Sequence, residues 1–249
     1  MLSWRIFSHS VKLVFRNLKH ALPISMPVIF VAIVQNVFQP TQMALDPTTA
    51  SDVLLPSTMQ TMSLLFGLAQ YIAGIWSAVA WHRFVLLEEY PTTVLPRWYG
   101  SQMLRYAMLG LLLGLILMAL SSIVGLIAVM LGAMLGLGVA VVLGLGMGLY
   151  LGVFWLRMAA VLPSRAIGET LSISDAIAAT KGASLAFMGL LLIFIIAVIC
   201  WMFVVLPLLF VSPVLVLAVG IPTQWVAWMA SISTLTTIHG IYIEGRSIE

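Results

Sequence analysis

The fold is decided by the uncharged stretch from Tyr106 to Leu156, which reads YAMLGLLLGLILMALSSIVGLIAVMLGAMLGLGVAVVLGLGMGLYLGVFWL. Its 51 residues include no charged side chain and no proline. A transmembrane helix needs about 20 mostly apolar residues, so this stretch is long enough for two spans. Glycine is a common break in such a run. The sequence therefore predicts a tight helical hairpin that turns near Gly132–Gly138, with Ser121–Gly125 as the alternative turn.

The composition of the whole chain agrees with a membrane protein. Of its 249 residues 62% are hydrophobic and 8% are charged, and the formal net charge is +3. A soluble domain needs far more polar surface, and a nucleic-acid-binding protein carries a larger and more concentrated positive charge. The single cysteine, Cys200, excludes an intramolecular disulfide and a cysteine-based metal cluster.

Other charge-poor stretches supply four further spans, so we predict an all-α polytopic bundle of six transmembrane helices arranged as three hairpins. We divide the chain into an interfacial segment, residues 1–20, and a transmembrane domain, residues 21–249. The apolar residues between Pro207 and Pro222 either rest in the interface or extend a helix. The predicted spans are 21–38, 58–84, 104–129, 134–157, 183–207 and 222–242.

The basic residues give the orientation. If the odd-numbered spans run outward, all 11 Lys and Arg residues lie on one side of the membrane. The opposite side then holds Asp46 and Asp52 in the loop 39–57. The positive-inside rule places the basic side in the cytoplasm, and both termini with it. We expect the N-terminal segment to be retained, because no clear cleavage site follows its apolar stretch.

Residues 4–19 form an amphipathic pattern. On a helical wheel the apolar side chains gather within about 100° of arc, which is typical of a helix lying in the membrane surface. The basic side chains occupy a separate arc, which would meet anionic headgroups. This helix is a topology anchor or a lipid-sensing or partner-docking element. The apolar arc contains Trp4, Phe7, Val11, Val14, Phe15 and Leu18, and the basic arc contains Arg5, His9, Lys12, Arg16 and Lys19.

The second span has small and polar residues at alternating spacings of three and four. They are Gln60, Ser63, Gly67, Gln70, Gly74, Ser77 and Trp81. One interpretation is a path for a polar solute. We favour a helix-packing seam at Gly67, Gln70 and Gly74, because small residues allow close approach and Gln70 can hydrogen-bond a neighbouring helix.

The fourth span has a glycine stripe with a spacing of four, at Gly136, Gly144, Gly148 and Gly152, with Ala140 between the first two. Dense glycine lowers helix propensity, so close packing must offset the cost. We predict that the stripe packs on Gly110 and Gly114 of the third span. Another copy of the chain, or another protein, is the alternative partner.

The loop after the fourth span contains a short helix signal. Ser174 can cap a helix over Asp175–Lys181, because Asp175 suits the first turn and Gly182 suits the end. We expect this helix to lie on the cytoplasmic face.

Several segments resemble uncharacterised six-span inner-membrane proteins of proteobacteria. The resemblance rests on Trp81-His82-Arg83-Phe84 with Glu88, on Gly168-Glu169, Ser174 and Lys181-Gly182, and on Glu244-Gly245-Arg246. It implies six spans in the bacterial inner membrane and brings no activity, cofactor or catalytic residue with it.

No Asp, Glu, Lys or Arg falls near the middle of a predicted span, and no nucleophile–base pair or metal-ligand cluster is recognisable. We therefore predict a non-catalytic accessory, assembly or structural subunit that engages membrane lipids and other membrane-protein subunits, without cofactor, metal or nucleic acid. His82 and Arg83 are then interface residues. The alternative is a small permease or channel for an uncharged solute or lipid. An interfacial enzyme using His82, Arg83 and Glu88 is the least favoured interpretation.

Overall fold

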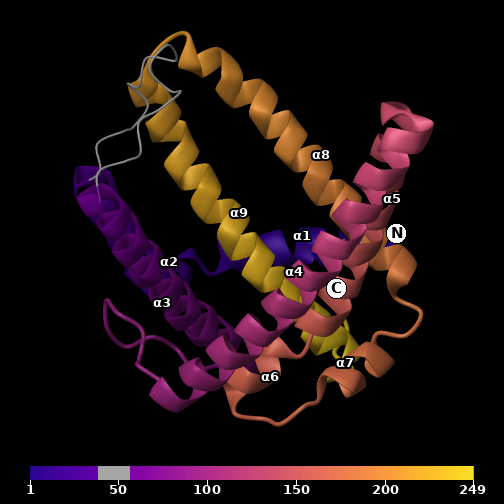
Figure 1. The fold of residues 1–249 in the computed structure, drawn as a ribbon. Coiled ribbons are helices and arrows are strands. Elements are labelled where there is room, and N and C mark those ends of the chain that lie inside the picture. Colours follow the sequence, from indigo (N-terminus) through magenta and orange to yellow (C-terminus); the bar gives the residue numbers. More distant parts are fainter. Residues whose placement is uncertain (39–56, 249) are drawn as a thin grey trace.

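The computed structural model describes residues 1–38 and 57–248, and these residues form nine α-helices and no strand (Figure 1). Six of the helices are long and apolar enough to cross a membrane, which confirms the predicted all-α six-span fold. They are α2 (Leu18–Phe38), α3 (Ser57–Leu87), α4 (Gly100–Leu135), α5 (Leu137–Ala159), α8 (Ser184–Leu209) and α9 (Pro213–Tyr242). The shorter helices are α1 (Leu2–Arg16), α6 (Leu162–Ile167) and α7 (Ile173–Ala179). The loop predicted over 39–57, with its two aspartates, lies outside the described residues except for its last position.

The turn between α4 and α5 lies within the predicted glycine segment. Gly136 adopts φ 97°, a conformation that favours glycine, and its N–H donates to the carbonyl of Gly132. The alternative turn is wrong, because Ser121 and Ser122 lie inside α4. Their hydroxyls donate to carbonyls four residues earlier, which keeps them satisfied within the apolar helix.

The connection between α8 and α9 is much shorter than the gap between the predicted spans 183–207 and 222–242. Helix α9 begins at Pro213, where the Ser212 hydroxyl accepts the Val214 N–H at 3.2 Å. The apolar residues before Pro222 therefore extend a helix, which was one of the two alternatives. Pro222 is tolerated inside α9, because prolines in membrane helices can be accommodated by local adjustment.

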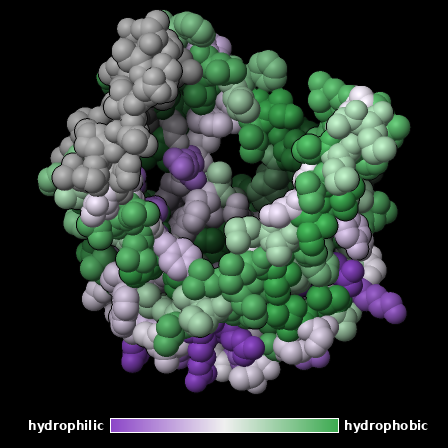
Figure 2. Space-filling model, viewed as in Figure 1, coloured by the Kyte–Doolittle hydropathy of each residue, from purple (hydrophilic) through white to green (hydrophobic). Residues whose placement is uncertain are grey.

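The six spans pack as three hairpins, with α2 on α3, α4 on α5, and α8 on α9. Helices α3, α5 and α9 end, and α4 and α8 begin, at one end of the bundle, together with α1, α6, α7 and the C-terminus (Figure 1). We call this the basic end, because the described Lys and Arg residues lie there. The other end is the open end, where the hairpins diverge around a hollow (Figure 2).

The core lies at the basic end. Its largest fully buried side chains include Trp81 and His82 of α3, Phe187 of α8 and Met229 of α9, and most of the short helix α6 is buried among them. Toward the open end the spans separate. In the most apolar 18-residue stretch of the spans that contain α4, α5 and α8, only 6% of the residues are buried inside the chain. The chain is thus a compact base that carries diverging arms.

Helix α1 packs across α8 and α9 at the basic end. Its buried side chains are Ile6, Ser10 and Val14, and the Ser10 hydroxyl lies 3.1 Å from that of Thr237. The helical wheel placed Val14 on the lipid-facing arc and overlooked Ile6, so that part of the prediction is wrong. Amphipathicity identifies an apolar arc but does not distinguish lipid from protein as its partner.

The short helix predicted in the loop after the fourth span exists, although its predicted cap is wrong. Helix α7 begins after Ser172, whose hydroxyl accepts the N–H of Asp175 at 3.1 Å, and the Asp175 carboxylate accepts the Ser172 N–H. This is a reciprocal capping box, and it starts two residues before Ser174. Helix α6, which directly follows α5, was not predicted.

Candidate functional site

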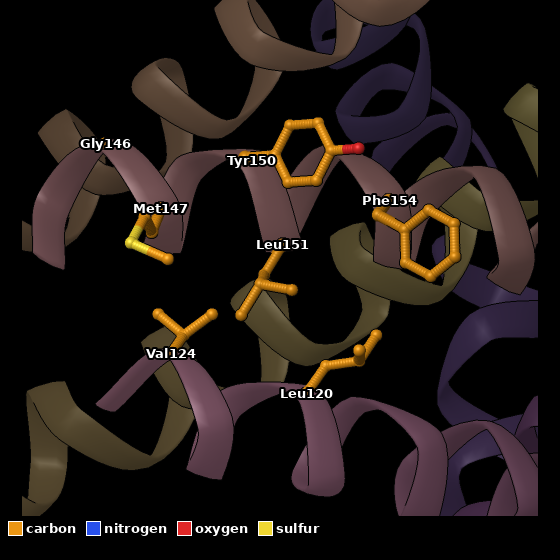
Figure 3. Close-up of a pocket in the computed structure, with 7 residues that line it drawn as sticks. All are labelled: Leu120, Val124, Gly146, Met147, Tyr150, Leu151 and Phe154. Atoms are coloured by element: carbon orange, nitrogen blue, oxygen red, sulfur yellow. The ribbon is translucent and has the colours of Figure 1, made fainter. Parts of the chain in front are cut away.

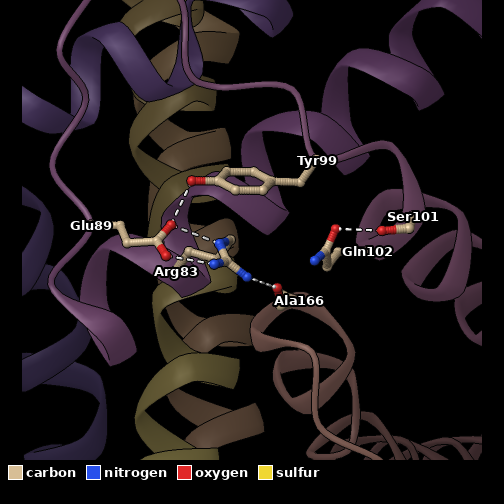
Figure 4. A network of polar contacts seen from close by, with 6 residues as sticks. All are labelled: Arg83, Glu89, Tyr99, Ser101, Gln102 and Ala166. Carbon is tan, nitrogen blue, oxygen red and sulfur yellow. Dashed lines mark hydrogen bonds and ion pairs between the residues drawn. The ribbon is translucent and has the colours of Figure 1, made fainter.

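The predicted interface residue Arg83 forms a polar network at the end of α3 (Figure 4). Its guanidinium donates to both carboxylate oxygens of Glu89, at 2.5 and 2.8 Å, and to the carbonyl of Ala166 at 3.0 Å. The Tyr99 hydroxyl also donates to Glu89, at 2.5 Å. These hydrogen bonds, led by those from Arg83, lower the pKa of the Glu89 carboxyl. The network fastens the 88–99 loop to α3 and α6, whereas the interfacial-enzyme interpretation required Glu88.

Other arginines at the basic end join helix ends in the same way. Arg157 of α5 donates to the carbonyl of Ile177 in the last turn of α7, at 2.8 Å. Arg246 donates to the carbonyl of Leu86 at the end of α3, at 2.9 Å. The last carbonyls of a helix lack intrahelical partners and carry partial negative charge. These cations therefore hold the base together, and they are not simply lipid-facing positive charges.

His82 lies at the centre of a directed hydrogen-bond chain. The Thr236 hydroxyl donates its proton to the carbonyl of Ile232 at 3.0 Å, so it can only accept from His82 Nδ1, which lies 2.8 Å away. The other ring nitrogen, Nε2, is then an acceptor for the Tyr106 hydroxyl at 3.3 Å. His82 is fully buried. It is therefore a core residue joining α3, α4 and α9, which corrects its predicted place at the lipid interface.

The second buried histidine, His239 of α9, also donates to a backbone group. Its Nδ1 lies 2.8 Å from the carbonyl of Ala160, and a carbonyl can only accept. Its Nε2 is 3.8 Å from the Glu244 carboxylate, which is itself paired with Arg246 at 2.5 Å. Each histidine thus donates its Nδ1 proton to an oxygen acceptor. Each ring then keeps Nε2 as an acceptor: that of His82 accepts from the Tyr106 hydroxyl, and that of His239 has no hydrogen-bond partner among the described residues.

Several buried polar atoms have no hydrogen-bond partner among the described residues. They are Gln70 Oε1, Ser77 Oγ, Trp81 Nε1, Ser233 Oγ and His239 Nε2. Ser77 and Ser233 precede His82 and Thr236 by five and three residues, so both lie toward the open end from that hydrogen bond. The polar stripe predicted on the second span therefore reaches the base of the bundle at its Ser77–Trp81 end.

The glycines predicted to pack helices have different surroundings from those expected. A Cβ atom at Gly67, Gly74, Gly110, Gly114, Gly144 or Gly148 would meet nothing within 4 Å in the described chain. Gly152 is the exception in its stripe, because a Cβ there would come within 2.8 Å of Leu191 Cδ1 of α8. The predicted seam between the α5 stripe and the α4 glycines is therefore wrong. The stripe contacts α8 at Gly152, whereas Gly148 and Gly144 have no such neighbour. Ala140 lies against Gly132 of α4 near the turn.

Two grooves lie along α4. One, of about 420 Å³, runs between α4 and α5 and is lined by Leu120 and Val124 on one side and by Met147, Tyr150 and Phe154 on the other (Figure 3). The other, of about 350 Å³, lies between α3 and α4 and includes Gly110 and Gly114. Both are lined almost wholly by apolar side chains. The uncovered α4 glycines thus form part of a groove wall.

The N-terminal basic residues keep an exposed face. Arg5, Lys12, Arg16 and Lys19 are exposed, as is Trp4 on the neighbouring apolar arc. Arg5 also donates to the carbonyl of Ile248, which fixes the C-terminal segment beside α1. Partial burial, Arg16 and Lys12 together lower the pKa of His9, so the charge of this face comes from the other basic residues. The predicted lipid contact of this face stays a prediction.

Within residues 1–38 and 57–248, no group of three histidine, cysteine, aspartate or glutamate side chains could hold a metal ion. Comparison of the chain with family models, with curated proteins and with solved structures finds no match.

Proposed function

We propose that this protein is a non-catalytic accessory subunit of the bacterial inner membrane, with both termini in the cytoplasm, and that it binds a transmembrane helix of a partner subunit between α5 and α8. The observation that carries this proposal is the change of surroundings along the α5 stripe. Gly152 meets Leu191 of α8, whereas Gly148 and Gly144, one and two turns further along, meet nothing within 4 Å.

The geometry suits a helix as the occupant. Helices α5 and α8 diverge toward the open end (Figure 1). Gly148 and Gly144 lie on the same face of α5 as Gly152, at spacings of four residues, so they border the space between the two helices. On α8, Ile195 and Met202 are exposed one and three turns beyond Leu191. Glycines let a neighbouring helix approach closely, and apolar side chains then pack around it. Without such packing, each glycine in a helix costs about 1 kcal/mol relative to alanine.

The test is site-specific photocross-linking in intact membranes. A photoreactive residue replacing Ile195 should give one discrete adduct with a membrane protein, while the same residue replacing the exposed Leu185 at the base of α8 should not. Gly148→Leu should abolish the adduct without lowering the thermal stability of the purified chain. Cross-linking of Ile195 to lipid alone would contradict the proposal, and an adduct of doubled mass would identify the partner as a second copy.

The alternative function is a small permease for an uncharged hydroxylated solute. It is favoured by the unpartnered Gln70, Ser77 and Ser233 atoms, because buried polar atoms normally have hydrogen-bond partners. In proteoliposomes, Gln70→Leu should abolish solute flux in a permease while the protein stays folded. The same substitution should leave helix binding between α5 and α8 intact.

A further inference from the structure

The groove between α3 and α4 has the length expected for a single hydrocarbon chain. Its wall on α4 runs from Tyr106 to Met118, and Tyr71 and Ile75 of α3 form the other side. Twelve residues of α-helix rise about 18 Å, close to the roughly 15 Å that one leaflet contributes to the hydrocarbon core. Gly110 and Gly114 leave the groove open on the α4 side, because neither has a side chain that would fill it.

The polar groups in this groove are already engaged by the protein. The Tyr106 hydroxyl is used by His82, and the Tyr71 hydroxyl is directed to the carbonyl of Ala107 at 3.5 Å. The remaining lining is aliphatic side chains, Met118 and the two glycines. The groove therefore has few free hydrogen-bonding groups for a polar solute, and its apolar interior suits an acyl chain.

The end of the groove nearest the basic end lies at the level of two tryptophans, Trp76 and Trp98, and of Arg97. Trp76, which follows Ile75 in α3, donates from its indole N–H to the carbonyl of Arg97 at 3.2 Å. The rings of Trp76 and Trp98 pack edge to face with centroids 5.0 Å apart. Tryptophan marks the membrane–water boundary. The side chain of Arg97 is exposed, and a guanidinium at this level pairs readily with a phosphate.

We propose that the α3–α4 groove binds one acyl chain of an anionic phospholipid of the cytoplasmic leaflet, whose headgroup phosphate pairs with Arg97. This lipid site is independent of the partner helix between α5 and α8, because the two use different faces of the bundle. A second copy of the chain is the competing occupant, because its helix would also cover Gly110 and Gly114.

The probe is a phosphatidylglycerol with a photoreactive diazirine in one acyl chain, added as a trace component to phosphatidylcholine nanodiscs that contain the full chain. Mass spectrometry should place the cross-links at Tyr71–Ile75 and at Tyr106–Met118. Gly114→Leu should remove these cross-links by filling the groove. Gly125→Leu is the matched control, because Gly125 lies on α4 outside the groove with nothing within 4 Å of its Cβ position. Gly110→Leu is the second filling variant, should Gly114→Leu not fold.

Arg97→Gln tests the headgroup. One basic residue near an anionic surface contributes about a fivefold preference, so this variant should lose about fivefold in cross-linking by the phosphatidylglycerol probe. A phosphatidylcholine with the same diazirine in its acyl chain is the control probe, and its cross-linking should be unaffected by Arg97→Gln. Cross-links spread evenly over all spans, or unchanged in both groove-filling variants, would overturn the proposal. A wild-type dimer that Gly114→Leu converts to a monomer would also overturn it in favour of a second copy.

Discussion

Arg83 and Glu89 form a two-bond ion pair, with Nη2–Oε1 at 2.5 Å and Nε–Oε2 at 2.8 Å. The same guanidinium reaches the carbonyl of Ala166. One side chain of α3 therefore fixes both the 88–99 loop and the end of α6. Lysine has a single ammonium group and cannot reproduce this fork.

The first prediction follows from that geometry. Arg83→Lys should lower the free energy of unfolding by about 1–3 kcal/mol, because it leaves the Glu89 carboxylate and the Ala166 carbonyl incompletely paired. Thermal unfolding in detergent measures the effect. Arg105→Lys is the control, since Arg105 is an exposed residue at the same end, and it should change stability by less than about 0.5 kcal/mol. Equal effects of the two substitutions would show that the fork is not stabilising.

The same pair predicts a pH dependence. The pKa of Glu89 is lowered in the folded chain, chiefly by its hydrogen bonds from Arg83. A carboxyl with a lowered folded pKa adds stability above its unfolded pKa of about 4.3, and that contribution is lost as the pH falls through the folded pKa. Acidification should therefore reduce the unfolding temperature of the wild type more than that of Glu89→Gln. Parallel loss in both proteins would place the acid sensitivity elsewhere.

The predicted topology can be tested with single cysteines in two loops. In a Cys200→Ser background, Thr49→Cys should react with an impermeant thiol reagent on intact spheroplasts, and Thr170→Cys should not. Thr170 is exposed in the loop between α6 and α7. It is preferable to Ser172, whose hydroxyl caps α7. Labelling at position 170 alone would reverse the orientation derived from the basic residues.

The span count and the hairpin turn could be predicted because they depend on local properties of the chain. The length of an uncharged run sets the number of spans, and a glycine such as Gly136 permits the positive φ that a tight turn requires. Helix ends were less predictable. Helix α9 passes through Pro222, since a proline in an apolar helix does not by itself end it.

The partners of the glycines and of His82 could not be predicted, because they depend on how the hairpins pack. Glycine spacing shows that close approach is possible but not which helix approaches, and here Leu191 of α8 meets Gly152. The position of His82 at a helix end suggested an interface. In the structure His82 is buried against Thr236, which lies 154 residues away in the chain. No periodic pattern in the sequence predicts a contact at that separation.

The His82 tautomer is a sharp test of the buried network. If the Thr236 proton is held by the Ile232 carbonyl, His82 must carry its proton on Nδ1. Selective ¹⁵N labelling of histidine should therefore show a protonated Nδ1 and a bare Nε2 for this ring. Tyr106→Phe should shift the Nε2 resonance, because it removes the donor to that nitrogen. A protonated Nε2 would instead show that the hydrogen bonds from Thr236 through His82 to Tyr106 run in the opposite direction.

The last prediction concerns the exposed basic face of α1. Lys12, Arg16 and Lys19 are exposed, and each basic residue near an anionic membrane surface contributes about 1 kcal/mol to binding. A peptide of residues 1–20 should therefore bind vesicles containing phosphatidylglycerol and gain helicity there. Replacing these three residues by glutamine should weaken binding by about 3 kcal/mol, and added salt should reduce the wild-type affinity toward that of the variant.

The structure also predicts a difference between the isolated peptide and the whole chain. In the peptide, Ile6 and Val14 are free to enter the lipid together with Trp4 and Phe15. In the protein, Ile6 and Val14 are buried in the bundle, while Trp4 and Phe15 stay exposed. Alanine at Ile6 should therefore weaken both peptide binding and protein stability, whereas alanine at Trp4 should weaken peptide binding and leave protein stability nearly unchanged. If Trp4→Ala destabilised the protein as much as Ile6→Ala, both would be core residues, and α1 would not present an apolar face to the membrane.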